Sequence, residues 1–265
     1  EWLATLLETD LRLVKSPRSY NSQVGVPLSL LRLKPDLDLA IIEAGISEPG
    51  EMIQLSRLIQ PQYGIMTHFG DAHAEGFVSS EEKLLQKRIL FLNCECVFVS
   101  ADAAEVCQAF RAENIPLQTV GFASDADLQV ISAEARPGGW DIELQEQNGE
   151  TSSVFLPVSG KAALENALLS ILAARHFGLS WDKLRTSLAT LYPVSMRMEL
   201  ITDNPEIAIV NDAYNADRAS VENAFAMLEG ERVHPGRALV LSDMEHQGPG
   251  QRAVQKQLLD TARQK

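Results

Sequence analysis

The sequence predicts an α/β protein in which a mostly parallel sheet is extended by an antiparallel meander and followed by part of a second α/β domain. Two observations support this fold class. Short apolar runs alternate with amphipathic helical patterns between residues 37 and 120, which is the order of a parallel, doubly wound sheet. From residue 127 onward, three strand-like runs follow one another across short turns, as in an antiparallel meander.

The first half of the chain supplies the strands and helices of the parallel part. The expected strands are Leu37–Glu43, Tyr63–Met66, Cys96–Val99 and Leu117–Val120. The expected helices are Glu1–Glu8, Pro27–Leu33, Glu51–Ile59, Ser79–Leu92 and Ala103–Ala112. Residues 15–26 are polar and are expected to form a loop, and Pro27 suits the first position of a helix. Asp102 is placed to cap the helix that follows it.

The second half begins with the meander and ends in a smaller α/β unit. The expected elements are the strands Asp127–Ala135, Trp140–Gln145 and Ser152–Val158 and the helices Lys161–Phe177 and Ser180–Leu191. Pro193 then indicates a boundary, which divides the chain into domains 1–193 and 194–265. The second domain is expected to contain the strands Met198–Thr202, Ile207–Asn211 and Ala238–Leu241 and the helices Ser220–Leu228 and Gln251–Gln264.

Composition narrows the class of partner. The chain has 265 residues and a formal net charge of −13, which argues against nucleic acid or an anionic membrane as the main partner. No signal peptide is visible, and no apolar run reaches the roughly 20 residues of a membrane span. The three cysteines have no framework spacing and are expected to be buried thiols. We therefore expect a cytoplasmic protein.

One segment concentrates groups that could carry chemistry. Thr67–Phe77 follows a predicted strand and holds two imidazoles and two carboxylates, and Lys83 and Lys87 follow one helical turn apart. Glu43 ends the preceding strand, and loops at the carboxyl ends of strands bind ligands in α/β sheets. A Glu and a His, here His73, on two strand ends suit Mg²⁺, which takes one or two protein ligands. The residues alone leave two alternatives open, namely unrelated polar loop residues and a solvated lysine face.

Other candidates are weaker. Gly160-Lys161 does not form the phosphate-binding motif G-x-x-x-x-G-K-[ST], because Phe155 and Ala162 stand where a glycine and a hydroxyl are needed. Asp212 could cap a helix or line a cleft, and Arg197 could be a surface cation or a phosphate contact.

Five blocks, in order, resemble the Mur ligase family. Ser19–Leu28 is similar to the family's Y-N-x-x-G-V-P-L segment, and Glu43-Ala44-Gly45 to its E-x-G block. Thr67–Phe77 resembles T-N-[IF]-G-x-A-H-x-E-x-F. Asn211–Asn215 and Leu241–Met244 resemble the D-x-Y-N and G-D-M blocks of the C-terminal domain.

The resemblance implies an ATP-dependent amide ligase of peptidoglycan synthesis that uses Mg²⁺. It is closest to the branch that joins D-alanyl-D-alanine to UDP-N-acetylmuramoyl-tripeptide through an acyl phosphate, in the form that some bacteria fuse to alanine racemase. The implied fold is a Mur ligase central domain followed by part of a Rossmann-like C-terminal domain. The implied site residues are Glu43, His73 and a carbamylated Lys87 for magnesium and catalysis, Asn166, Arg197 and Asp212 for the nucleotide, and Asn21, Tyr214 and Asn215 for the substrate.

The chain also departs from the family pattern. The family's phosphate loop would precede Glu1, so we expect a partial chain that is inactive by itself. His68 replaces the usual asparagine, and Ala162-Ala163 stands where many relatives have His-Asn. Two alternatives remain: a ligase like folylpolyglutamate synthetase, and a non-catalytic α/β module that binds a partner or a nucleotide.

Overall fold

The computed structural model describes residues 1–69, 76–158, 160–192, 199–204, 206–213, 218–230, 238–241 and 251–264. Its main sheet has the order β3 (Tyr63–Ile65), β4 (Cys96–Ser100), β5 (Leu117–Gly121), β6 (Leu128–Arg136), β7 (Gly139–Glu146) and β8 (Thr151–Leu156). Neighbouring strands are parallel from β3 to β6 and antiparallel from β6 to β8. The predicted parallel sheet with an added meander is therefore confirmed.

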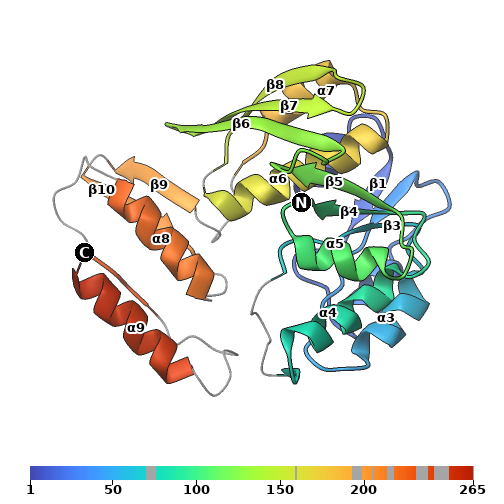
Figure 1. Ribbon diagram of the computed structural model, residues 1–265, viewed down its shortest axis with the longest axis horizontal. Coiled ribbons are helices and arrows are strands. Elements are labelled where there is room, and N and C mark those ends of the chain that lie inside the picture. Colours follow the sequence, from blue (N-terminus) through green and yellow to red (C-terminus); the bar gives the residue numbers. More distant parts are fainter. Residues whose placement is uncertain are drawn as a thin grey trace.

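Helices cover both faces of the parallel part (Figure 1). One face is packed by α1 (Trp2–Leu7), α6 (Lys161–His176) and α7 (Trp181–Leu188), and the other by α4 (Ser80–Arg88) and α5 (Ala104–Arg111). Successive residues of β4 alternate between the two cores, with Phe98 in the first and Val97 and Val99 in the second. A strand buried on both faces needs apolar residues throughout, which explains the continuous apolar run.

A small parallel sheet precedes this core. β1 (Leu13–Lys15) pairs with β2 (Leu39–Ile41), and Arg12 and Asp38 join the two strands through backbone and side-chain hydrogen bonds of 2.9–3.1 Å. The prediction of a loop from residue 15 missed β1, because its three residues are only partly buried and show no apolar alternation. α2 (Gly25–Leu30) also begins before Pro27. A proline is tolerated there because the first four N–H groups of a helix have no intrahelical partner.

The one capping prediction, for Asp102, is wrong, and the structure shows a cap at Ser79 instead. α3 (Glu51–Ile59) has the predicted bounds, and α4 is followed by the short 3₁₀ helix η2 (Ile89–Phe91). The Ser79 hydroxyl caps α4 by accepting a hydrogen bond from the Glu82 N–H at 3.1 Å. Asp102 does not cap α5, since Ala103 occupies that position. Its carboxylate instead accepts hydrogen bonds from the Phe122 and Ala123 N–H groups in the loop after β5.

The C-terminal part forms a separate small core. β9 (Glu199–Asn204) and β10 (Ile207–Asn211) are antiparallel, and α8 (Arg218–Gly230) packs on α9 (Gln251–Gln264) through Val221, Phe225 and Leu258. The predicted strand Ala238–Leu241 is wrong: these residues pair with no strand of the described chain, and Val240 is 96% exposed. The predicted boundary at Pro193 lies outside the described residues. None of the described helices is long and apolar enough to cross a membrane.

Candidate functional site

Glu43, which follows β2, is held by groups from two other segments. The Asn21 side-chain amide donates a hydrogen bond of 2.8 Å to the Glu43 carboxylate, and the Glu43 N–H donates one of 3.0 Å to the Ser16 hydroxyl. The Gly45 N–H donates to the Asn21 carbonyl at 2.8 Å. The blocks Ser19–Leu28 and Glu43–Gly45 therefore form one hydrogen-bonded unit. In it, Asn21, a predicted substrate residue, contacts Glu43, a predicted metal ligand.

Close backbone approach explains the glycines of this unit. A Cβ atom on Gly45 would lie 3.3 Å from the Asn21 amide, and one on Gly25 would lie 2.7 Å from the Tyr20 backbone. Any side chain at Gly25 would push the Tyr20-Asn21 segment away. The glycines thus let Asn21 reach the carboxylate.

The far end of the Thr67–Phe77 segment packs against the same unit. A Cβ atom on Gly76 would lie 1.8 Å from the Ser47 carbonyl oxygen, so the two backbones are in direct contact. Phe77 shares a buried cluster with Ile42, Ala44 and Ile46, which flank Glu43 in sequence. Gly76 and Phe77 therefore lie beside the segment that carries Glu43.

Helix α4 contacts the turn after Glu43, and Ile89 and Leu90, which follow α4, pack on the same cluster. The Gln86 side chain accepts a hydrogen bond of 2.8 Å from the Gly50 N–H. Lys87 is half-buried, burial lowers the pKa of its amine, and no ion pair joins it to the described residues. Lys83 is 3% exposed, and its ammonium lies 5.3 Å from the centre of the Phe69 ring. The alternative of a solvated lysine face is therefore wrong.

The start of α1 lies close to Glu43. The Glu1 carboxylate forms an ion pair with Lys15. The backbone nitrogen of Glu1 lies within electrostatic range of Glu43. The start of α1, the end of β1 and the end of β2 therefore form one charged group.

A second group lies at the carboxyl ends of β4 and β5, against α6. His68 leaves β3 and places its Nδ1 atom 3.5 Å from a carboxylate oxygen of Glu165, the neighbour of Asn166 on α6. The His68 hydrogen bond lowers the pKa of Glu165, and burial opposes this shift. A cavity of about 150 Å³ lies beside the pair; its polar lining is Ser100, Asp102, Lys161 and Glu165. We did not predict this group from the sequence, although Ser100-Ala101-Asp102 directly after an apolar strand was a usable signal.

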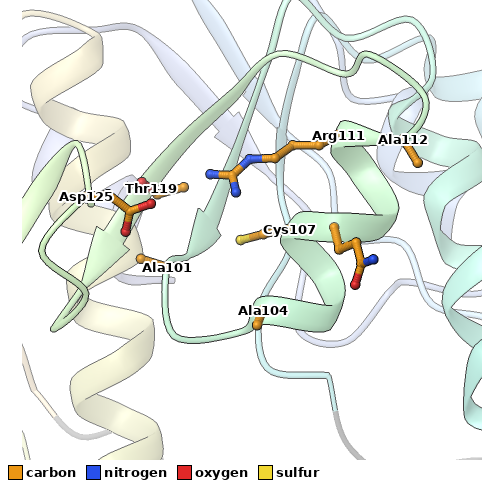
Figure 2. Close-up of a pocket in the computed structure, with 8 residues that line it drawn as sticks. Ala101, Ala104, Cys107, Arg111, Ala112, Thr119 and Asp125 are labelled. Carbon is orange, nitrogen blue, oxygen red and sulfur yellow. The ribbon is translucent and has the colours of Figure 1, made fainter.

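A wider groove of about 610 Å³ lies between α5 and the loop after β5 (Figure 2). The Arg111 side chain extends across it toward Thr119 and Asp125, and the Cys107 thiol lies beneath. That thiol donates to the Ser100 carbonyl, and the Thr119 hydroxyl bonds Asp127, so both groups are engaged within the protein. None of the predicted site residues lines this groove.

Four predicted site residues, His73, Arg197, Tyr214 and Asn215, lie outside the described residues. Within the described part of the chain, no three acidic, histidine or cysteine side chains are grouped to hold a metal ion; the predicted set includes His73 and remains a prediction. Asp212 follows β10 and is half-buried. Since α8 begins only at Arg218, Asp212 does not cap this helix.

This chain is similar to known proteins both in sequence and in fold. The Mur ligase middle domain family matches residues 1–174. The chain is 27% identical over 247 residues to the UDP-N-acetylmuramoyl-tripeptide–D-alanyl-D-alanine ligase of Bacillus subtilis, covering 92% of this chain and 53% of that protein. It is also 27% identical over 256 residues to the Escherichia coli ligase of the same name, covering 92% and 55%. The chain spans about half the length of the curated relatives it matches.

Solved structures agree on the fold. MurF from Acinetobacter baumannii superposes with a TM-score of 0.85 at 22% identity, over 97% of this chain and 56% of that one. MurF from Thermotoga maritima, solved in complex with ADP, gives 0.84 at 21% identity, over 98% and 60%. The apo form of the folylpolyglutamate synthase of L. casei gives a TM-score of 0.65 at 18% identity, over 86% of this chain and 67% of that one. Because the Mur ligase middle domain family matches residues 1–174, more than half of the sequence, this chain belongs to the Mur ligase family.

Proposed function

We propose that the protein carrying this chain is an ATP-dependent ligase of peptidoglycan synthesis that joins D-alanyl-D-alanine to UDP-N-acetylmuramoyl-tripeptide. The observation that carries the proposal is the contact between Asn21 and Glu43, which unites two family blocks in one site. The names of the Bacillus subtilis and Escherichia coli relatives support the substrate pair. The match in fold to an ADP complex supports the nucleotide.

The donor set around Glu43 suits magnesium. The Asn21 amide donates a hydrogen bond to one oxygen of the Glu43 carboxylate. Because the Glu43 side chain is exposed, its other oxygen is available from solvent. Hard divalent cations take such oxygens and complete their shell with water and phosphate. We assign Glu43, His73 and Lys87 to magnesium, with Lys87 acting as a carboxylate after carbamylation. Burial lowers the pKa of its amine, and this direction supports the assignment, because only a neutral amine adds carbon dioxide. Bound magnesium would offset charge on the triphosphate.

The remaining residues take the parts that the family resemblance implies. Asn166 on α6 contacts the nucleotide base, and Arg197 and Asp212 approach the nucleotide from the C-terminal domain. Asn21, Tyr214 and Asn215 face the substrates. The proximity of the start of α1 to Glu43 supports a triphosphate site at that end of the sheet. The proposed domains are residues 1–193 and 194–265.

The reaction has two steps. A carboxylate oxygen of the tripeptide attacks the γ-phosphorus of ATP, the bond to the bridging oxygen breaks, and ADP leaves with the electron pair. The amine of D-alanyl-D-alanine then attacks the acyl carbon, inorganic phosphate leaves, and the amine loses a proton. The residues of this chain hold the two substrates and the triphosphate in place and exclude water from the acyl phosphate.

The free, buried cysteines fit a cytoplasmic setting. A fusion to alanine racemase and inactivity of this chain by itself stay predictions.

Phosphate release measured on the protein that carries this chain tests the proposal. We expect Mg²⁺- and ATP-dependent release only when UDP-N-acetylmuramoyl-tripeptide and D-alanyl-D-alanine are both present. Glu43→Gln should abolish it, whereas Glu48→Gln, a nearby exposed carboxylate, should retain it. Release with a folate and glutamate instead would favour the folylpolyglutamate-synthetase-like alternative. Nucleotide binding without turnover on either pair would favour the non-catalytic module.

A further inference from the structure

The groove between α5 and the loop after β5 contains none of the residues assigned to the proposed reaction. Its volume of about 610 Å³ is in the range of pockets that hold small ligands. Cys107 and Thr119 lie deepest in it, since they are 4% and 3% exposed, and both are bonded within the protein. The groove therefore has a fixed inner surface, and the groups left to meet a ligand are those nearer its rim.

Three polar side chains of the groove are free to meet a ligand. Within the described part of the chain, the side chains of Gln108, Arg111 and Asp125 form no hydrogen bond and no ion pair. Figure 2 shows the Arg111 side chain extending across the groove toward the side on which Asp125 lies. A cation and an anion thus face the same space without pairing with each other.

The loop that carries Asp125 is held at both ends. At its start, the Asp102 carboxylate accepts hydrogen bonds of 3.1 and 3.2 Å from two backbone N–H groups of the loop. At its end, the Asp127 carboxylate accepts bonds of 2.7 and 2.9 Å from the Thr119 N–H and hydroxyl groups. Because the loop is already ordered, a ligand that binds Asp125 loses less free energy to ordering of the protein.

Both charges act on the inner surface of the groove. Burial raises the pKa of the Cys107 thiol; the charge of Arg111 opposes this shift, and the charge of Asp125 adds to it. The guanidinium and the carboxylate are therefore both within electrostatic range of one atom in the groove. A ligand seated above that sulfur would meet both of them.

We propose that this groove binds a small zwitterion with a short apolar side chain, the chemistry of an α-amino acid. The Arg111 guanidinium binds the carboxylate through parallel N–H donors, and the Asp125 carboxylate binds the ammonium. The Gln108 amide can donate to one group or accept from the other. The site goes beyond the proposed ligase function and does not depend on it.

The rest of the lining sets the size and charge of the ligand. Three alanines, Ala101, Ala104 and Ala112, present methyl groups that suit an apolar side chain of few carbons. A phosphate or a dicarboxylate would bring extra negative charge beside Asp125, and like charges in one site disfavour binding. The groove therefore selects a zwitterion over a plain anion.

The alanine methyl groups report binding directly. In the protein that carries this chain, labelled with ¹³C at its alanine methyls, an NMR titration with free L-alanine should shift Ala101, Ala104 and Ala112 to saturation. Ala109 is the internal control, because it lies on the same helix but packs on the buried cluster next to α4. Its signal should stay in place.

Two analogues of L-alanine separate the roles of the two charges. Propionate lacks the amine, and ethylamine lacks the carboxylate. Each should bind about fivefold more weakly than L-alanine, since an ion pair open to solvent contributes modestly. Propionate that binds as tightly as L-alanine would overturn the proposal in favour of a plain anion site.

Variants locate the site. Arg111→Gln and Asp125→Asn should each weaken L-alanine binding about fivefold. The matched controls are Arg57→Gln on α3 and Glu105→Gln on α5, which remove exposed charges that do not line the groove and should keep the native affinity. All four variants should unfold at the native temperature, because these side chains have no bonding partner within the described chain.

The remaining outcomes also decide. Methyl signals that do not move with L-alanine, or native affinity in either Arg111→Gln or Asp125→Asn, overturn the proposal. Loss of affinity in Arg57→Gln or Glu105→Gln equal to that in the groove variants would show a general charge effect and would overturn it as well. None of these results bears on phosphate release, so the ligase proposal stands or falls separately.

Discussion

At the scale of single residues, Asn21 and Glu43 explain why two short sequence blocks are needed together. The Asn21 amide occupies one oxygen of the carboxylate, and the Gly45 N–H holds the Asn21 backbone. In the proposed magnesium site, this arrangement leaves the second carboxylate oxygen for the cation. Lys87 is the other proposed ligand, because a carbamylated side chain there would supply a second carboxylate.

Carbamylation of Lys87 can be observed directly. With ¹³C-labelled bicarbonate, the protein should show a carbamate carbon signal that disappears in Lys87→Arg, because a guanidinium does not add carbon dioxide. Lys83→Arg is the matched control: Lys83 lies one turn earlier and is buried beside Phe69. A carbamate signal that persists in Lys87→Arg would place the modification elsewhere, and no signal in the native protein would remove Lys87 as a ligand.

At the scale of elements, the site depends on segments that touch through their backbones. The contact between Gly76 and Ser47 holds the segment after β3 against the turn after β2. Ionic and hydrogen-bonded contacts between Arg12 and Asp38 align β1 with β2, which ends just before Glu43. Each contact gives a separate test.

Gly76→Ala should destabilise the protein and weaken metal-dependent activity. Its Cβ atom would meet the Ser47 carbonyl at 1.8 Å, so the backbone must move, at a cost of about 1–3 kcal/mol. Thermal or urea unfolding measures the loss. The control is Gly149→Asn, in an open hairpin turn with φ +85°, where asparagine is tolerated. Equal unfolding midpoints for the two variants would refute the close contact.

The Arg12–Asp38 contact predicts a pH effect on stability. Hydrogen bonds from the Arg12 side chain and backbone lower the pKa of Asp38 to about 2. A carboxyl with a lowered folded pKa stabilises the fold above its unfolded pKa, about 4, and the contribution is lost as pH falls toward 2. Asp38→Asn should therefore lose part of the native change in urea midpoint between those pH values. Asp36→Asn, 3.9 Å from Arg12, should keep it.

The elements that the sequence predicted well are those with a clear burial pattern. β4 is apolar because both faces are covered, and α3 and α9 have the bounds that their amphipathic patterns indicated. β1 was missed because it is short and half-exposed, and Ala238–Leu241 was wrongly predicted from apolar residues that no described strand pairs. Asp102 was misassigned because two N–H groups from a loop distant in sequence compete for its carboxylate.

The sequence showed the residues of the candidate site but not which of them are in contact. The blocks themselves were visible, but the contact between Asn21 and Glu43 depends on glycines that let separate segments approach. The pairing of His68 with Glu165 joins residues far apart in the chain and had no local signal. Long-range hydrogen bonds and ion pairs of this kind follow from the fold rather than from the pattern around either residue.

At the scale of the whole molecule, the parallel sheet separates two cores and presents its carboxyl edge for ligands. The neighbours of Glu43 in sequence, Phe77 at the end of the Thr67–Phe77 segment, and Ile89 and Leu90 just after α4 pack in one small cluster. The His68–Glu165 pair lies at the ends of β3 and α6. We therefore propose that metal and nucleotide bind on adjoining parts of one edge of the sheet.

The location of the metal tests this account most directly. Crystals of the protein that carries this chain, grown with ADP and Mn²⁺, would show the metal by its anomalous signal. We expect a peak at about 2–2.5 Å from the Glu43 carboxylate, with the Asn21 amide still on the other oxygen. A fully occupied ADP–Mn²⁺ site with no metal at Glu43 would contradict the central claim.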